Sequence, residues 1–160
     1  AWPAEAAALA TAGGDGNARY LSADEAFRAL YTQLLSGLEF TADARLGRPL
    51  GEPGRPRPTR AEAWRSGRPL PNALASAEAA VRVATLLADA PLPATQGALD
   101  QVRRAAAAVG DPSLQDIEAP AARLKVEILQ QRLRALLDAL EAELGAPRGL
   151  RPGFNSRDGD

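Results

Sequence analysis

The residues best suited to chemistry in this sequence are Arg65 and Arg68, which are separated by Ser66 and Gly67. Each guanidinium is a planar set of donors that matches the geometry of a carboxylate or a phosphate. Gly67 has no side chain, so a ligand or a neighbouring segment could approach the backbone closely there. With Trp64 beside it, the pattern predicts an anion clamp. The alternative is a structural corner in which the arginines pair with acids of the same chain.

Other polar residues join this motif as candidates. Glu39 is expected at the C-terminal end of a helix, where a negative charge is unfavourable, so it is predicted to pair with one of the two clamp arginines. Asn72 follows the motif and is included as a ligand candidate. Asp158 and Asp160 near the C-terminus are hard oxygen donors that suit a cation site. The alternative for these two aspartates is a solvated acidic tail.

The composition excludes several kinds of site. The chain has no histidine and no cysteine, so it cannot supply a Ser-His-Asp triad, an HExxH zinc site or a thiolate. We therefore expect no catalytic residue and no cofactor in this chain alone. The net charge of −1 and a basic loop without aromatic residues give no support for nucleic-acid binding.

The N-terminal residues do not resemble a signal peptide, because they contain Glu5 and no basic region. No apolar run is long enough to cross a bilayer. We expect the chain to be a processed or excised piece, with any export signal or lipid-attachment site upstream.

Four amphipathic stretches must position the candidate residues. Ser22 and Glu25 match a capping box and predict the start of the first helix, whose apolar stripe runs from Phe27 to Leu38. Further helices are predicted over residues 72–89, 96–109 and 120–144. Thr95 is expected to cap the third helix. Several further residues are expected to widen the apolar faces: Val83, Leu86 and Leu87 in the second helix, and Leu124, Ile128, Leu137 and Leu144 in the fourth.

The segment between the first two helices is rich in proline, glycine and arginine. Residues 41–60 are predicted to form a long loop, because so many prolines and glycines disfavour both helix and strand. Thr59 and Glu62 repeat the capping-box spacing and predict a short helix that carries Trp64 and ends at Gly67.

These elements predict an all-α fold, an up-and-down four-helix bundle with a long Pro/Gly/Arg-rich crossover loop and short accessory helices. The whole chain, residues 1–160, is expected to be one domain. Within it, residues 1–20 are a remnant or loosely docked N-terminal helix, 21–145 the bundle and 146–160 an irregular tail.

Three segments carry a family resemblance. Glu62-Ala-Trp-Arg-Ser-Gly-Arg68 resembles the arginine-serine-glycine-arginine segment of imelysin-like proteins. Gly37-Leu-Glu-Phe40 with Arg45-Leu-Gly-Arg-Pro-Leu-Gly51 resembles the segment before that motif. Gly153-Phe-Asn-Ser-Arg-Asp-Gly-Asp160 is similar to the ending of the predicted lipoprotein branch. Pro69 departs from the pattern, which has serine after the second arginine.

The resemblance implies a fold of two related helical bundles with a functional site near their interface, and this chain resembles the C-terminal bundle. It implies an exported protein of Gram-negative bacteria, periplasmic or anchored to the outer membrane through an upstream lipid, and linked to iron acquisition. The implied partner is an N-terminal imelysin-like domain, and a homodimer through the exposed face is a further expectation. The family's histidine-and-glutamate metal motif has no match here, so iron or another divalent metal is expected only in the full-length protein.

Three functions follow from these observations. The first is ligand or metal-complex binding at the junction with the missing domain, through Glu39, Arg65 and Arg68. The second is a metal-dependent hydrolase whose metal ligands lie in the missing domain, with the arginines polarising the substrate. The third is a structural helical interaction module.

Overall fold

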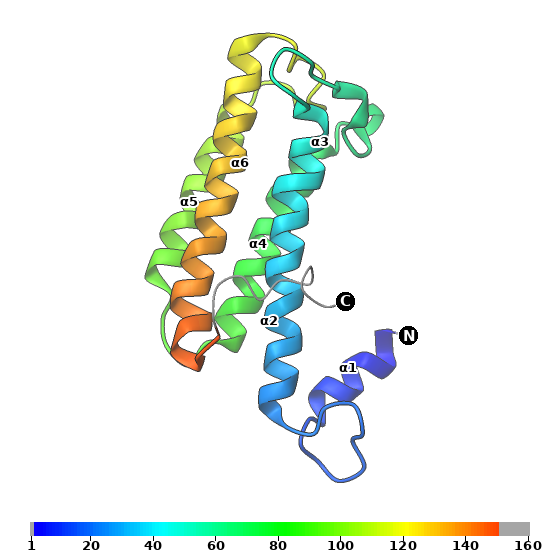
Figure 1. Ribbon diagram of the computed structural model, residues 1–160, viewed down its shortest axis with the longest axis vertical. Helices are drawn as coiled ribbons and strands as arrows, with labels where there is room; N and C mark the ends of the chain where they lie inside the picture. Colours follow the sequence, from blue (N-terminus) through cyan, green and yellow to red (C-terminus); the bar gives the residue numbers. More distant parts are fainter. Residues whose placement is uncertain (1, 151–160) are drawn as a thin grey trace.

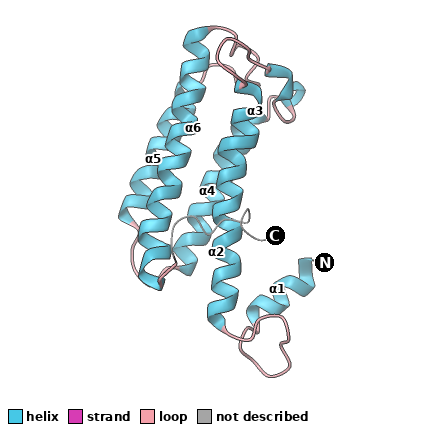
Figure 2. Cartoon of the chain, in the orientation of Figure 1, coloured by secondary structure: helices cyan, strands magenta, loops and turns pink. Residues whose placement is uncertain are grey.

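The computed structural model describes residues 2–150 of the 160-residue chain. Its long helices are α2 (Ala23–Glu39), α4 (Pro69–Leu87), α5 (Pro93–Ala108) and α6 (Pro120–Leu140). They run alternately up and down, and each packs against two neighbours, in the order α2, α4, α5, α6 around the bundle (Figure 1). Within residues 2–150 there is no strand, and helices joined by loops make up the chain (Figure 2). The predicted all-α four-helix bundle is confirmed.

The core forms where the predicted apolar stripes meet. In α6 the residues spaced alternately three and four apart are all buried: Val126, Leu129, Leu133, Leu136 and Leu140. In α2 the buried residues are Ala26, Phe27, Tyr31, Leu34, Leu35 and Leu38. This spacing keeps one face of each helix toward its neighbours along the whole bundle.

The predicted widening of the apolar faces is confirmed for Leu137 and Leu144, which are buried, and for Leu87, which packs against the core. It is wrong for the other residues. Leu86 is 85% exposed, Leu124 is 56% exposed, and Val83 and Ile128 also lie at the surface. For Val83 and Leu86 the reason is that α4 meets the core through a narrow face of small residues, which includes Ala73, Ala77, Val81 and Ala84. Such a face lets the helices pack closely, and it leaves the larger residues beside it in solvent.

The start of α2 follows the predicted capping box. The Oγ of Ser22 accepts a hydrogen bond of 3.2 Å from the backbone amide of Glu25. The Glu25 carboxylate reaches back and accepts from the amide of Leu21 at 2.7 Å. Two free amides at the helix start are thus satisfied.

The predicted long loop over residues 41–60 is wrong for its first half. After α2 the chain continues as a π-helical segment, Phe40–Leu46, and then as α3 (Gly47–Leu50). The side chain of Gln130 on α6 donates to the carbonyl of Ala42 at 2.7 Å, which holds the wide turn against the bundle. The chain leaves the helical path only at Gly51, where φ is 58°.

The second predicted capping box, from Thr59 to Glu62, does not form. Two 3-10 turns, Pro58–Arg60 and Trp64–Ser66, stand where the short helix was expected, and neither has a side-chain cap. Ala63 between them has φ 54°, a left-handed conformation that no helix can include.

The opposite end of the bundle holds a cap that comes from a distant segment. Thr95 does not cap α5 but lies buried inside its first turn. The amides of Ala94 and Thr95 instead donate to the Glu143 carboxylate, each at 2.8 Å. Glu143 belongs to a π-helical segment, Glu141–Gly145, that extends α6 and ends in a 3-10 turn, Ala146–Arg148.

The first helix, α1 (Trp2–Ala10), lies beside the lower end of α2 and outside the bundle (Figure 1). Its Glu5 pairs with Arg19 and accepts a hydrogen bond from the Tyr20 hydroxyl, both at 2.5 Å. None of the described helices combines the length and apolarity needed to cross a membrane.

Candidate functional site

The clamp arginines lie on a tight turn, residues 63–68, which we call the arginine corner. Ala63 at its start and Gly67 near its end both adopt left-handed conformations, with φ 54° and 63°. The Ala63 carbonyl accepts hydrogen bonds from the Ser66 hydroxyl at 2.9 Å and from the Ser66 amide at 3.1 Å. Gly67 ends the turn as predicted, because its conformation disfavours residues with a side chain.

Several contacts attach the arginine corner to the bundle. Ala61, just before it, is buried, and Trp64 is half-buried against the core. Pro69, which departs from the family pattern, is buried and begins α4. The amide of Leu70 donates to the carbonyl of Pro112 at 3.1 Å, so the loop before α6 holds the start of α4 directly after the corner.

Arg65 and Arg68 are both exposed on this fixed turn. The Arg65 guanidinium lies over the Trp64 ring, with 4.4 Å from its Cζ to the ring centroid. Within the described part of the chain, neither arginine forms an ion pair. The structural alternative, in which acids of the same chain neutralise both arginines, is therefore not what residues 2–150 show.

The expected partner Glu39 is not at the corner. The helix continues past Glu39 as the π-helical segment, so this carboxylate does not face free carbonyl groups at a helix end. The physical reason for the predicted ion pair is thus absent. Glu39 is half-buried and lines a polar hollow of about 580 Å³ together with Asp43 and Arg48. Asn72 lies in the first turn of α4, one turn after Arg68.

Arg45, which no sequence pattern singled out as a site residue, connects the corner to the bundle. Its Nε lies 3.0 Å from the Glu62 carboxylate, and its Nη1 donates to the Ser76 hydroxyl of α4 at 2.6 Å. Its Cζ is also 5.4 Å from the centroid of the Phe40 ring. In the sequence, Arg45 and Glu62 are 17 residues apart and begin two of the segments that resemble the family, which is too little to predict a contact between them.

A carboxylate next to the corner is satisfied locally. Asp111 accepts hydrogen bonds from the Ser113 hydroxyl at 2.6 Å and from the Gln115 amide at 2.7 Å. Burial alone would raise the pKa of Asp111, but these hydrogen bonds outweigh burial and lower it. Asp111 is therefore charged and engaged within its own loop.

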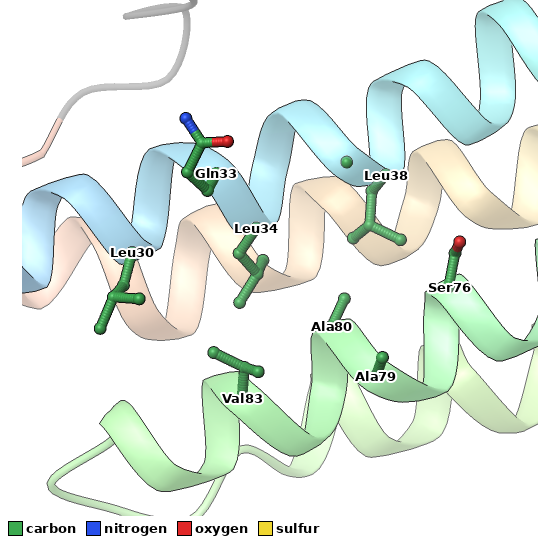
Figure 3. A pocket seen from close by; sticks show the side chains of 9 residues that line it. Leu30, Gln33, Leu34, Leu38, Ser76, Ala79, Ala80 and Val83 are labelled. Atoms are coloured by element: carbon green, nitrogen blue, oxygen red, sulfur yellow. The ribbon is translucent and has the colours of Figure 1, made fainter. Parts of the chain in front are cut away.

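A second hollow lies between α2 and α4 and is of a different kind. Figure 3 shows Leu30, Leu34 and Leu38 of α2 facing Ala80 and Val83 of α4 across it. Its volume is about 310 Å³, and its lining is mostly apolar. A groove of this composition offers little to an anion, so the arginine corner remains the better candidate for a charged ligand.

Comparison with known protein families identifies the family of this chain. Residues 1–140 match the family model described as Imelysin, of peptidase type M75. The chain belongs to the imelysin family. No curated protein and no solved structure matches it. The match includes the arginine corner, Arg45 and Glu39, whereas residues 153–160, which suggested the lipoprotein branch, lie beyond it.

In this imelysin-family chain, residues 2–150 contain no group of three or more histidine, cysteine, aspartate or glutamate side chains placed to hold a metal ion. The weaker candidates Asp158 and Asp160 lie outside the described residues. The chemistry available at the arginine corner is recognition of an anion by two exposed guanidinium groups, with open space beside the half-buried backbone of Gly67. The hydroxyl of Ser66, which lies between the two arginines in the sequence, donates to the Ala63 carbonyl at 2.9 Å.

Proposed function

We propose that this chain is the non-catalytic helical bundle of an exported imelysin-family protein, and that its arginine corner binds a carboxylate-bearing ligand. The observation that supports this most is the exposure of Arg65 and Arg68 on a fixed turn without an acidic partner in residues 2–150. Guanidinium groups in this state offer free N–H donors in pairs, which suit carboxylates.

The shape of the turn favours a ligand. A side-chain carbon added at Gly67 would meet nothing within 4 Å, so the space beside the backbone is open between the two arginines. The corner is held at Trp64 and Leu70, so little order has to be gained when the ligand binds. With the backbone of the turn held, the ordering on binding is confined to the two exposed arginine side chains.

We extend this proposal to the biology implied by the family. The protein is periplasmic or anchored to the outer membrane by an upstream lipid, and it takes part in iron acquisition. Iron then reaches this chain as a complex with an organic acid, and the corner binds the acid's carboxylates. A second, N-terminal imelysin-like domain would supply the metal ligands and cover the corner, and without that domain two copies could associate through the same face.

Calorimetric titration with citrate and with ferric citrate tests this proposal. We expect the wild type to bind, and the double variant Arg65→Gln/Arg68→Gln to lose at least tenfold in affinity. Arg55→Gln/Arg57→Gln is the matched control, because it removes the same charge from exposed arginines of the same crossover. Equal losses of citrate affinity in both double variants would show that binding depends on overall charge and not on the corner. Unchanged affinity in Arg65→Gln/Arg68→Gln would refute the proposal.

The family's peptidase type favours a second candidate, a hydrolase with its metal ligands in the other domain. In that case the arginines would polarise a substrate carbonyl or bind a peptide carboxylate. Metal-dependent peptide hydrolysis by the full-length protein, lost on Arg65→Gln/Arg68→Gln, would support it. A purely structural module predicts that the same double variant changes stability and no binding.

A further inference from the structure

We propose that Arg45 and Glu62 act together as positioning residues for the arginine corner, holding the turn in the conformation that presents both guanidinium groups to an anion. This inference rests on the proposed function of the corner. Neither residue is expected to touch the ligand itself.

Arg45 is well placed to act as an anchor. It lies in the π-helical segment next to Leu46, and both Leu46 and the nearby Thr41 are fully buried. Its side chain is only 26% exposed and contacts Glu62, Ser76 and Phe40 at once. A guanidinium with three such contacts has one orientation, so its position is set by the core and by α4.

Glu62 transmits this position to the turn. It directly precedes Ala63, which is not glycine and still has φ 54° and ψ 34°. A residue with a side chain keeps a left-handed conformation only when its surroundings impose it. The ion pair from Arg45 to Glu62 at 3.0 Å acts one residue before this point.

The conformation of Ala63 decides the rest of the corner. Its carbonyl accepts from the Ser66 hydroxyl and amide, and more weakly from the Arg68 amide at 3.4 Å. If Ala63 relaxed to φ below zero, this carbonyl would turn away and the turn would open. Arg65 and Arg68 would then no longer share one geometry.

Charge alone makes a different prediction. Glu62 is negative and close in sequence to Arg65, so simple electrostatics would make it an obstacle to an anion. Substitutions that keep every charge separate the two explanations. Glu62→Asp shortens the side chain by one methylene, and Arg45→Lys replaces a fork that serves two partners with a single point charge.

The test measures citrate affinity by calorimetry and the melting temperature on the same samples. We expect Glu62→Asp and Arg45→Lys each to weaken citrate binding about threefold, since a partly exposed ion pair shifts a conformational equilibrium by about that much. The variant that combines Glu62→Asp with Arg45→Lys should bind citrate no worse than either single variant, because both substitutions disrupt the same ion pair. Glu52→Asp and Arg48→Lys are charge-conserving controls at exposed positions of the same crossover, and they should bind as the wild type does.

The outcomes separate this inference from the function on which it rests. If Arg65→Gln/Arg68→Gln abolishes binding while Glu62→Asp and Arg45→Lys bind normally, the positioning role is wrong and the clamp stands. If the wild type does not bind citrate, or the arginine double variant binds as well as the wild type, the proposed function itself fails. Glu62 is exposed, so Glu62→Asp should leave the melting temperature nearly unchanged even if Arg45→Lys lowers it.

Discussion

Two turns at opposite ends of the bundle have nearly the same local structure and different surroundings. The turn Trp64–Ser66 ends at Gly67, with φ 63° and ψ 24°, and the turn Ala146–Arg148 ends at Gly149, with φ 68° and ψ 15°. Each places an arginine over an aromatic ring, Arg65 over Trp64 and Arg148 over Phe27. Local structure therefore does not explain why one corner is a candidate site and the other is not.

The difference lies in what the rest of the chain brings to each arginine. Arg148 lies 3.9 Å above Phe27, a core residue, and pairs with Asp89 at 2.6 Å. Arg65 stacks on a ring of its own turn and has no acid in residues 2–150. An acid from a distant segment, such as Asp89, pairs with the arginine of the turn and gives that arginine a structural role. Without one, the same turn is available for a ligand.

The largest effect is expected at the closed lower end, at Gly145. A side-chain carbon added there would overlap the Oη and Cζ atoms of Tyr31, which is itself buried and stacked on Phe27. We expect Gly145→Ala to lower the free energy of unfolding by about 2 kcal/mol, because the ring has to shift in a packed core. Urea denaturation followed by circular dichroism measures this.

The control for this substitution is Gly97→Ala in α5, where an added carbon would meet nothing within 4 Å. It should stabilise the chain by about 0.5–1 kcal/mol, since alanine favours a helix interior more than glycine does. Equal effects of the two substitutions would contradict the close packing at Gly145.

The second prediction compares the two arginines directly. Arg148→Gln should cost about 1.5 kcal/mol of stability, because it removes both the stack on Phe27 and the pair with Asp89. Arg65→Gln should cost about 0.5 kcal/mol at most, because only an exposed stack is lost. Citrate binding should respond in the opposite order. If Arg148→Gln weakened binding as much as Arg65→Gln, the division between a structural and a ligand-binding corner would be wrong.

The third prediction concerns the cap that Glu143 provides to α5. Glu143→Ala should cost about 1 kcal/mol, because the amides of Ala94 and Thr95 lose their shared acceptor. The loss should appear at neutral pH in thermal unfolding.

The pH dependence of that cost has a definite sign. Burial alone would raise the pKa of Glu143, but the backbone amides of Thr95 and Ala94 outweigh it and hold the pKa below the usual 4.5. A lowered pKa in the folded state gives stability that is present above pH 4.5 and is lost as the pH falls through the folded value. The wild type and Glu143→Ala should therefore converge in acid, and a constant difference at about pH 3 would show that the charge is not involved.

Much of the bundle could be predicted from the sequence because its determinants are local. The apolar residues from Phe27 to Leu38 and from Val126 to Leu140 recur at helical spacing. This spacing alone identifies both the helix and the face of it that is buried. The capping box that begins at Ser22 satisfies backbone amides within one helical turn, so it too could be predicted from the sequence.

What could not be predicted depends on contacts between distant segments. Glu143 caps α5 from 48 residues away, and no pattern near Thr95 indicates it. The π-helical segment after α2 continues a helix while shifting its register, and Gln130, 88 residues away, holds the wide turn. For the same reason the sequence indicated the arginine corner but assigned it the wrong partner, Glu39, and overlooked Arg45.

The smallest expected effect comes from bringing an acid to the open corner. Asn72 lies in the first turn of α4, four residues after Arg68. Asn72→Asp places a carboxylate where it faces the positive end of the helix and can pair with Arg68, as Asp89 pairs with Arg148. We expect a gain in stability of about 0.3–0.5 kcal/mol and a loss in citrate affinity of about threefold, both measured on one sample by calorimetry.

Gln101→Glu is the control for this last prediction, because it adds the same charge at an exposed position of α5, away from the corner. If both variants weakened citrate binding equally, long-range repulsion would account for the loss and the comparison of the two corners would lose its force. If only Asn72→Asp weakens citrate binding, and the same substitution raises stability, a single acid will have given the arginine corner the same kind of ion pair that Arg148 has with Asp89. That result would place the functional difference between the two ends in the lack of an ion-pair partner for Arg68 within residues 2–150, with the turn itself unchanged.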